Sequence, residues 1–148
     1  MRICVVTPAP RNSRTGNRVT ALRWARILRD LGHDAKISET YNGRACDLLV
    51  ALHARRSFDA IKCVVSHRPK VPIILALTGT DLYGDIKTHA TARRALELAW
   101  RLVVLQPMAL HELSASMRVK TRVILQSVSS PTQAAAPRKD AFEVCVLG

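Results

Sequence analysis

Residues 77–85, LTGTDLYGD, place Gly, Thr and Asp directly after the apolar run VPIILA. Asp81 is the first acidic residue after this run, and Asp85 follows four positions later. A carboxylate in such a place can act as a base or hydrogen-bond the hydroxyls of a sugar. Ligands of open α/β sheets bind at the carboxyl ends of the strands, so the stretch is a candidate floor of an active site.

Spacing alone leaves two interpretations of Asp81 open. The carboxylate either takes part in chemistry or caps the following turn, with Gly79 serving the backbone. For Asp85, a turn or cap role is favoured. His53 ends a second apolar run, DLLVALH, and either packs there or acts in catalysis.

A further candidate is the loop PAPRNSRTGN, residues 8–17, ahead of a predicted helix. Gly16 and Asn17 stand at the expected helix start, where backbone N–H groups and the helix dipole favour anions. The cationic residues beside this start are Arg11, Arg14 and Arg18. The pattern predicts a phosphate site. The alternative is a flexible basic loop, because a single Gly is not the GxGxxG motif.

The elements that must position these residues alternate between apolar strands and helices. Strands are predicted at 2–7, 35–40, 46–53, 72–78, 101–106 and 121–128, and helices at 17–34, 54–69, 89–100 and 107–117. This order predicts an α/β fold, a Rossmann-like and mostly parallel sheet with helices on both faces. In the first helix, the predicted packing stripe is Val19, Leu22, Ile27, Leu28 and Leu31, with Trp24 close to it.

The pattern changes after residue 128. Residues 129–140, SSPTQAAAPRKD, are small, polar and Pro-containing, which is typical of a linker. Residues 141–148, AFEVCVLG, have the composition of a new strand. We therefore expect a Rossmann-like first domain over 1–128, a linker over 129–140, and the first strand of a truncated second domain over 141–148.

Composition limits the class of protein. The 148 residues are 48% hydrophobic, which is enough for a sizeable core. The four cysteines form no CxxC pair, so we expect reduced, buried thiols and no metal site. No apolar run approaches the roughly 20 residues of a membrane helix. The N-terminus is interrupted too early by proline for a signal peptide, and we expect a cytoplasmic protein.

The net charge of +12 predicts anionic partners. Nucleic acid is not the expected partner, because aromatic residues make up only 4% of the chain and the basic residues form no dense run. Phosphorylated small molecules and an acidic membrane surface are the other candidates.

Five stretches resemble the N-terminal half of glycosyltransferases of the GT-B fold, family 4 type. They are RICVVTPAPRNSRTGNRVTALRWARILRDLGHDAKI, DLLVALHARRSFDAI, PIILALTGTDLYGDI, RLVVLQPMALHEL and TRVILQSV. GNRVTALRW with LALTGTDLYGDI and RLVVLQP is similar to one subgroup, the selenosugar synthases of selenoneine biosynthesis. The resemblance implies sugar transfer from UDP-N-acetylglucosamine or UDP-glucose to selenophosphate, giving a selenosugar and UDP. It implies no metal and no other cofactor.

The resemblance also implies roles for single residues. Gly16 matches the loop Gly that faces the donor diphosphate, although many members have two adjacent Gly there, and Asn17 lies beside it. Asp81 keeps the acidic position of the HGxD motif, whose His is replaced by Thr78, and His53 matches a His often found after strand three. The implied catalytic residues are Asp81 and His53, and the implied acceptor-binding residues are Arg11, Arg14, Arg18, Thr78, Gly79 and Thr80.

Donor-binding Glu residues of the family belong to its second domain, so we expect the 148-residue chain to be inactive alone. Two other functions are open. One is a family 4 transferase with a carbohydrate or lipid acceptor, although contact with a membrane surface through the basic helix at 18–31 is not favoured. The other is a non-catalytic basic domain that binds nucleic acid.

Overall fold

A computed structural model describes residues 1–127 and 140–142 of the chain. The strands within them are β1 (Arg2–Val6), β2 (Asp34–Ser38), β3 (Leu48–Leu52), β4 (Ile73–Leu77), β5 (Arg101–Val104) and β6 (Thr121–Val123). The helices are α1 (Gly16–Asp30), α2 (Phe58–His67), α3 (Ile86–Thr88), α4 (Ala90–Leu98) and α5 (Ala115–Val119). A π-helical turn, η1 (Asp81–Asp85), and a 3-10 helix, η2 (Pro107–Glu112), complete the set.

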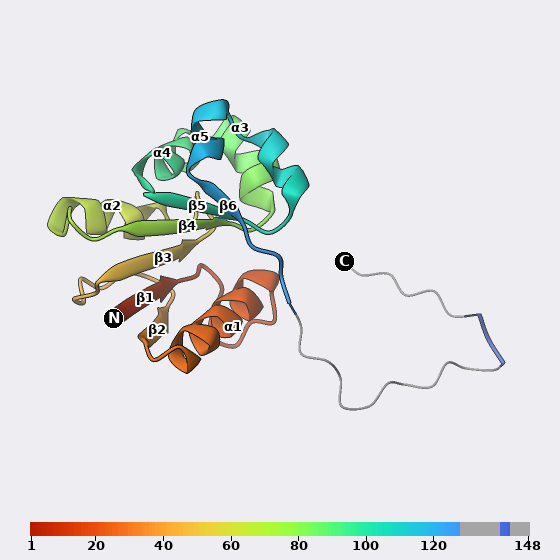
Figure 1. Cartoon of the computed structure of the whole chain (residues 1–148), viewed down its shortest axis with the longest axis horizontal. Helices are drawn as coiled ribbons and strands as arrows, with labels where there is room; N and C mark the ends of the chain where they lie inside the picture. Colours follow the sequence, from red (N-terminus) through yellow and green to blue (C-terminus); the bar gives the residue numbers. More distant parts are fainter. Residues whose placement is uncertain (128–139, 143–148) are drawn as a thin grey trace.

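The strands form one sheet in the order β2-β1-β3-β4-β5-β6, and every neighbouring pair in it is parallel. Their carboxyl ends therefore share one edge, as at β1, where Val6 lies opposite both Ser38 and Ala51. Figure 1 shows the strands side by side, with α1 on one side of the sheet and α4 and α5 on the other. The predicted α/β class with a Rossmann-like sheet and helices on both faces is confirmed.

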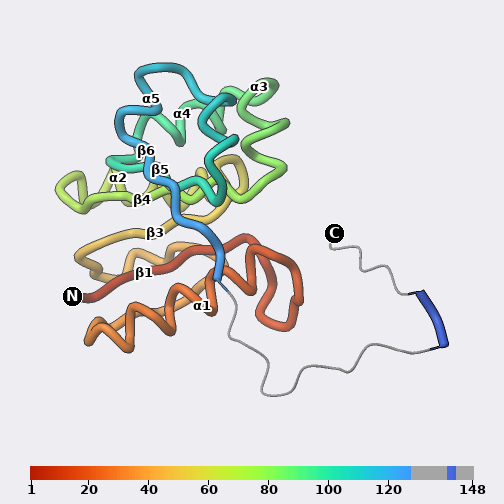
Figure 2. The backbone as a smooth tube through the Cα atoms, turned by 45° about the vertical axis from the view of Figure 1, so that its right-hand side comes forward, coloured from red at the N-terminus to blue at the C-terminus, as the bar shows by residue number. Residues whose placement is uncertain are grey.

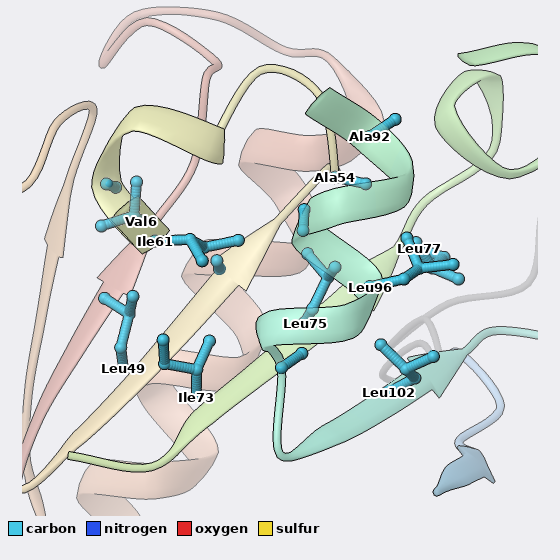
Figure 3. Close-up of a cluster of buried hydrophobic side chains, with 14 of the residues drawn as sticks. Val6, Leu49, Ala54, Ile61, Ile73, Leu75, Leu77, Ala92, Leu96 and Leu102 are labelled. Atoms are coloured by element: carbon cyan, nitrogen blue, oxygen red, sulfur yellow. The ribbon is translucent and has the colours of Figure 1, made fainter. Parts of the chain in front are cut away.

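Two apolar layers hold the helices to the sheet. On one face, side chains of β3, β4 and β5 pack against α2 and α4, as Figure 3 shows for Leu49, Ile61, Leu75 and Leu96. The central strands β1, β3, β4 and β5 are covered on both faces, so their sequences are nearly continuous apolar runs, which is why these strands could be predicted.

The predicted packing stripe of α1 is wrong. Four of its residues are largely exposed: Val19 45%, Leu22 48%, Ile27 44% and Leu31 67%. The helix instead meets the sheet through Ala21 and Ala25, which are fully buried, with Trp24 and Leu28 half-buried beside them. Small side chains let the helix approach the strands closely, so the larger apolar residues turn outward.

The segment after β6 returns across the face of the sheet on which α1 lies. Figure 2 shows this part of the chain beside the helix. The side chain of Gln126 donates a hydrogen bond from Nε2 to Thr20 Oγ1 at 3.2 Å. This contact joins the end of the described domain to the first half of α1.

Three regions differ from their predicted secondary structure. The strand predicted at 121–128 ends at Val123. Residues 79–88, for which neither a helix nor a strand was predicted, contain η1 and α3. The helix predicted at 107–117 is divided into η2 and α5, because the backbone is extended at Leu113, whose side chain is buried in the core.

The predicted linker at 129–140 and the predicted strand at 141–148 lie outside the described residues, apart from 140–142. These domain boundaries stay predictions. In the described ranges, no helix has the length and apolar character required to cross a membrane.

Candidate functional site

The edge formed by the carboxyl ends of the strands contains a topological switch point. The helix after β1 covers one face of the sheet, whereas the helix after β3 covers the other face. Since β1 and β3 are neighbours, the two connections leave adjacent strand ends in opposite directions. A crevice opens at such a point in open α/β sheets, and ligands bind in it.

The first side of this crevice is the start of α1. Thr15, the N-cap residue, makes no side-chain capping hydrogen bond, and the first turn contains no acidic side chain. Gly16 is exposed, and a Cβ atom added there would meet no other atom within 4 Å. Unblocked N–H groups at a helix start favour an anion, as the sequence predicted for Gly16 and Asn17.

Arg18 is the most unusual residue of this helix start. Its exposed fraction is only 9%, and its Nε atom is buried without a hydrogen-bond partner in the described part of the chain. A buried N–H donor without a partner is costly, and a ligand oxygen that accepts a hydrogen bond from Nε would remove that cost. Arg11 and Arg14, the other two predicted cations, are exposed on the preceding loop.

The second side of the crevice is His53, directly after β3. Its backbone has a φ of 73°, in the left-handed region that non-glycine residues rarely adopt, and its side chain is only 2% exposed. Such backbone strain costs about 1–3 kcal/mol and is concentrated at functional sites.

Hydrogen bonds define the proton position on the His53 ring. Nδ1 accepts a hydrogen bond from the backbone N–H of Arg56 at 3.4 Å, so the proton is assigned to Nε2. Nε2 then donates to Thr80 Oγ1 at 3.2 Å. The ring is therefore oriented with a donor toward the loop after β4.

Burial lowers the pKa of His53 below its ordinary value, and the nearby cations Arg56 and Arg55 lower it further. Asp81 and Asp85 act in the opposite direction, but they do not cancel the effect of burial on this pKa. His53 is consequently neutral near pH 7. A neutral imidazole can donate one hydrogen bond and does not carry a positive charge into the site.

The surroundings of Asp81 favour the capping interpretation over the catalytic one. Its side chain is completely buried, with Oδ2 accepting from the N–H of Ala54 and Oδ1 from those of Thr78 and Gly79, each at 2.9 Å. No surface of the carboxylate remains for a substrate. Asp81 ties the end of β3 to the end of β4, which is the capping alternative, and so positions the residues around it.

Asp85 lies beside His53, although the sequence analysis favoured a turn or cap role for it. Its carboxylate is 16% exposed and lies 3.8 Å from Nε2 of His53, 3.3 Å from Arg55 and 3.6 Å from His89. The pair Asp85 and His89 has the i,i+4 spacing of one helix face, which was the available signal. This spacing was not used because no helix was predicted over residues 79–88.

The predicted site residues form two groups along the edge of the sheet. The first group, at β1 and α1, contains Arg11, Arg14, Gly16, Asn17 and Arg18. The second group, at β3 and β4, contains His53, Thr78, Gly79, Thr80 and Asp81. Because β1 and β3 are adjacent, the two groups lie at neighbouring strand ends on one edge of the sheet.

The buried thiols are not candidates for catalysis at this edge. Cys4 and Cys46 are buried, and burial raises the pKa of Cys4 to about 11, so that thiol is protonated and unreactive at neutral pH. Cys145 lies outside the described residues. Over the residues that the structure describes, no group of three or more His, Cys, Asp or Glu side chains is arranged to hold a metal ion.

Compared with protein-family models and with curated proteins, the sequence matches none of them.

Proposed function

We propose that residues 1–128 are the acceptor-side domain of a GT-B glycosyltransferase of family 4 type. In this proposal the enzyme transfers a sugar from UDP-N-acetylglucosamine or UDP-glucose to selenophosphate. The observation that carries the proposal is Arg18, a buried guanidinium with an unpartnered Nε at a helix start beside the switch point. Both substrates are anions, and both fit a helix start whose first turn contains no acidic side chain.

The start of α1 is the proposed phosphate site. The N–H groups of Gly16 and Asn17 would bind the donor diphosphate, since the Thr15 side chain does not cap the helix. Arg18 would form paired hydrogen bonds to phosphate oxygens, for which a planar guanidinium is suited. Arg11 and Arg14, which are exposed on the loop, would attract the acceptor anion.

The transfer itself breaks the bond between the anomeric carbon and the diphosphate oxygen, which leaves with the electron pair. A lone pair on the selenium of selenophosphate forms the new bond to that carbon, and water then cleaves the P–Se bond, which releases phosphate and leaves the selenosugar. The protein's part is to stabilise negative charge on the leaving diphosphate and to align the two reactants. His53, neutral and with a proton on Nε2, would orient the loop at Thr80 rather than transfer a proton to a charged group.

The test uses the complete gene product that contains these residues. It is incubated with UDP-N-acetylglucosamine or UDP-glucose, with and without selenophosphate, and products are identified by mass spectrometry. A selenium-containing sugar with one equivalent of UDP would establish the proposal. UDP release only with another acceptor would keep the glycosyltransferase and reject selenophosphate. No UDP release with any donor and acceptor would reject the enzyme and favour a binding role.

A lipid acceptor has one observation in its favour. Val19, Leu22 and Ile27 are exposed on α1, beside Arg23 and Arg26. A helix face that is both apolar and basic binds the surface of anionic membranes. Co-sedimentation with phosphatidylserine vesicles, lost on changing Leu22 and Ile27 to Ser, would support this version, and equal sedimentation of the variant would reject it.

A further inference from the structure

We infer that the cavity between the carboxyl ends of β4 and β5 binds an uncharged pyranose ring; the inference rests on the proposed glycosyltransferase function. This cavity, called here the ring pocket, has a volume of about 340 Å³. Its walls come from the loop after β4, from η1 and from the start of η2. Ligand pockets of proteins span about 300–1,000 Å³, so this volume suits a single ring better than a whole nucleotide.

The floor of the ring pocket is apolar and its rim is polar. Leu82 and Ala109 form buried parts of the floor, and Leu105 is half-buried beside them. Tyr83 and Gln106 stand on the rim and are exposed. A sugar ring has the same division, with C–H groups on its faces and hydroxyls around its edge.

Tyr83 and Gln106 present a hydrogen-bonding pair to the pocket. The Nε2 atom of Gln106 donates to the Tyr83 hydroxyl oxygen at 2.5 Å, although the two residues are 23 positions apart in the sequence. The phenolic proton and the Gln106 amide oxygen then remain for a ligand. One donor and one acceptor side by side match neighbouring sugar hydroxyls, each of which both donates and accepts. The flat ring of Tyr83 offers apolar surface to the C–H face.

The ring pocket is uncharged in a strongly basic protein. None of the eight residues that line it is Asp, Glu, Lys, Arg or His, whereas the chain as a whole has a net charge of +12. The cations of the edge lie instead on α1, on its preceding loop and after β3. A phosphate group would therefore bind beside those cations, and the ring pocket would take the neutral part of a ligand.

The loop at 78–80 connects the ring pocket to the switch-point crevice. Thr78 and Gly79 line the pocket, and the next residue, Thr80, contacts His53. The phosphate site follows β1, and neighbouring strands lie about 4.8 Å apart, so the ends of β1 and β5 are separated by roughly 14 Å. A molecule of nucleotide-sugar size, in extended form, is long enough to contact both sites.

A pyranose could come from two sources, the sugar of the nucleotide donor or a carbohydrate acceptor. The experiment records amide signals of the ¹⁵N-labelled 148-residue chain during separate titrations with phosphate, UDP, UDP-N-acetylglucosamine and methyl N-acetylglucosaminide. Signals of Tyr83 and Gln106 report the ring pocket, and signals of Gly16 and Arg18 report the phosphate site. If the amide signals of Tyr83 and Gln106 shift with UDP-N-acetylglucosamine but not with UDP, the pocket binds the donor sugar. If these signals shift with the methyl glycoside, the pocket binds a carbohydrate acceptor.

The variant Tyr83→Phe removes the hydroxyl and keeps the aromatic face. Loss of one hydrogen bond should weaken pyranose binding by about two- to tenfold. Gln106→Ala should have an effect of similar size, because it removes the acceptor. The control is Tyr41→Phe, whose hydroxyl donates to the Arg44 carbonyl in the loop before β3, away from the carboxyl edge.

The inference is supported if a pyranose shifts the pocket signals in a saturable way, and if Tyr83→Phe weakens this binding while Tyr41→Phe does not. It would be overturned if no pyranose moved these signals, or if Tyr83→Phe bound the pyranose as tightly as the unmodified chain. Phosphate or UDP shifts at Gly16 without pyranose shifts would reject the ring pocket alone. Pyranose shifts without any anion shifts would reject the proposed nucleotide-sugar function and keep the pocket.

Discussion

The carboxyl edge of the sheet has two halves with opposite character. The basic half, at β1 and β3, contains Arg11, Arg14, Arg18, Arg55 and Arg56. The neutral half is the ring pocket at β4 and β5, whose lining contains no charged side chain. The difference indicates that this edge is suited to a ligand with one anionic part and one neutral part.

The two halves are also built by different means. The basic half depends on an uncapped helix start and on the strained backbone of His53. The neutral half depends on a π-helical turn that presents Tyr83 opposite Gln106. Asp81 lies between them, with hydrogen bonds to both strand ends. The predictions below test whether the halves are separable, from the largest expected effect to the smallest.

Replacing Asp81 with Ala should damage both halves together. Three backbone N–H groups would lose their acceptor, and each buried unsatisfied group costs about 1–3 kcal/mol. The free energy of unfolding should therefore fall by roughly 3 kcal/mol or more, as measured by urea denaturation. Asp30→Ala, which removes an exposed carboxylate paired only with Arg26 at 3.8 Å, is the control and should have little effect. Equal stability of the two variants would contradict the positioning role.

Replacing Arg18 with Gln should affect the basic half alone. Charge-assisted hydrogen bonds contribute about 1.5–3 kcal/mol, so affinity for UDP or pyrophosphate should fall at least about tenfold in calorimetry. Arg26→Gln makes the same change of charge on the same helix, but at an exposed side chain, and should leave affinity nearly unchanged.

The stability of the Arg18 variant without ligand tests whether the buried Nε atom is a cost to the folded protein. Since the unliganded protein buries Nε without a partner, Gln should not destabilise it, and denaturation in the absence of ligand should show this. If Arg18→Gln and Arg26→Gln lost affinity equally, anion binding would reflect net charge and not a built site.

His53, which lies between the two halves, should make the free energy of unfolding depend on pH. Its pKa in the folded protein is below the ordinary value of 6.5, so the unfolded chain binds a proton that the folded chain does not. The free energy of unfolding contributed by this residue is then complete above pH 6.5 and decreases as the pH falls below it.

The variant His53→Asn tests this assignment, because Asn tolerates positive φ and does not titrate. Urea denaturation at pH 7.5 and 5.5 should show a smaller loss of stability for the variant than for the unmodified chain. The same loss in both proteins would assign the pH dependence to other groups.

The smallest effect is expected from Asp85→Asn. Its ion pair with Arg55 and its contact with His89 lie at the surface, and surface ion pairs contribute about 0–1 kcal/mol. Because Asp85 raises the pKa of His53, its removal should lower that pKa further, as followed by the imidazole resonances in NMR titration. A rise of the His53 pKa in the variant would contradict the arrangement.

The sequence predicted those parts of the candidate site that are formed by residues adjacent in the chain. Gly16, Asn17 and the arginines beside them could be assigned to a helix start because the loop and the helix are adjacent in sequence. Asp81 could be placed at a strand end, but its role could not be decided, since one of its partners is Ala54, at a separation of 27 residues. Tyr83 was not assigned to any site, because nothing near it in the sequence indicates Gln106.

The sequence by itself determined the α/β alternation, the strands and the basic character of the edge. These properties follow from composition and apolar runs, since a parallel strand buried on both faces must be apolar along its length. The order of the strands brought β1 next to β3 and β4 next to β5. Only this tertiary arrangement buried Arg18, strained His53, enclosed Asp81 and closed the ring pocket. Such properties depend on contacts between distant segments, and neighbouring residues do not encode them.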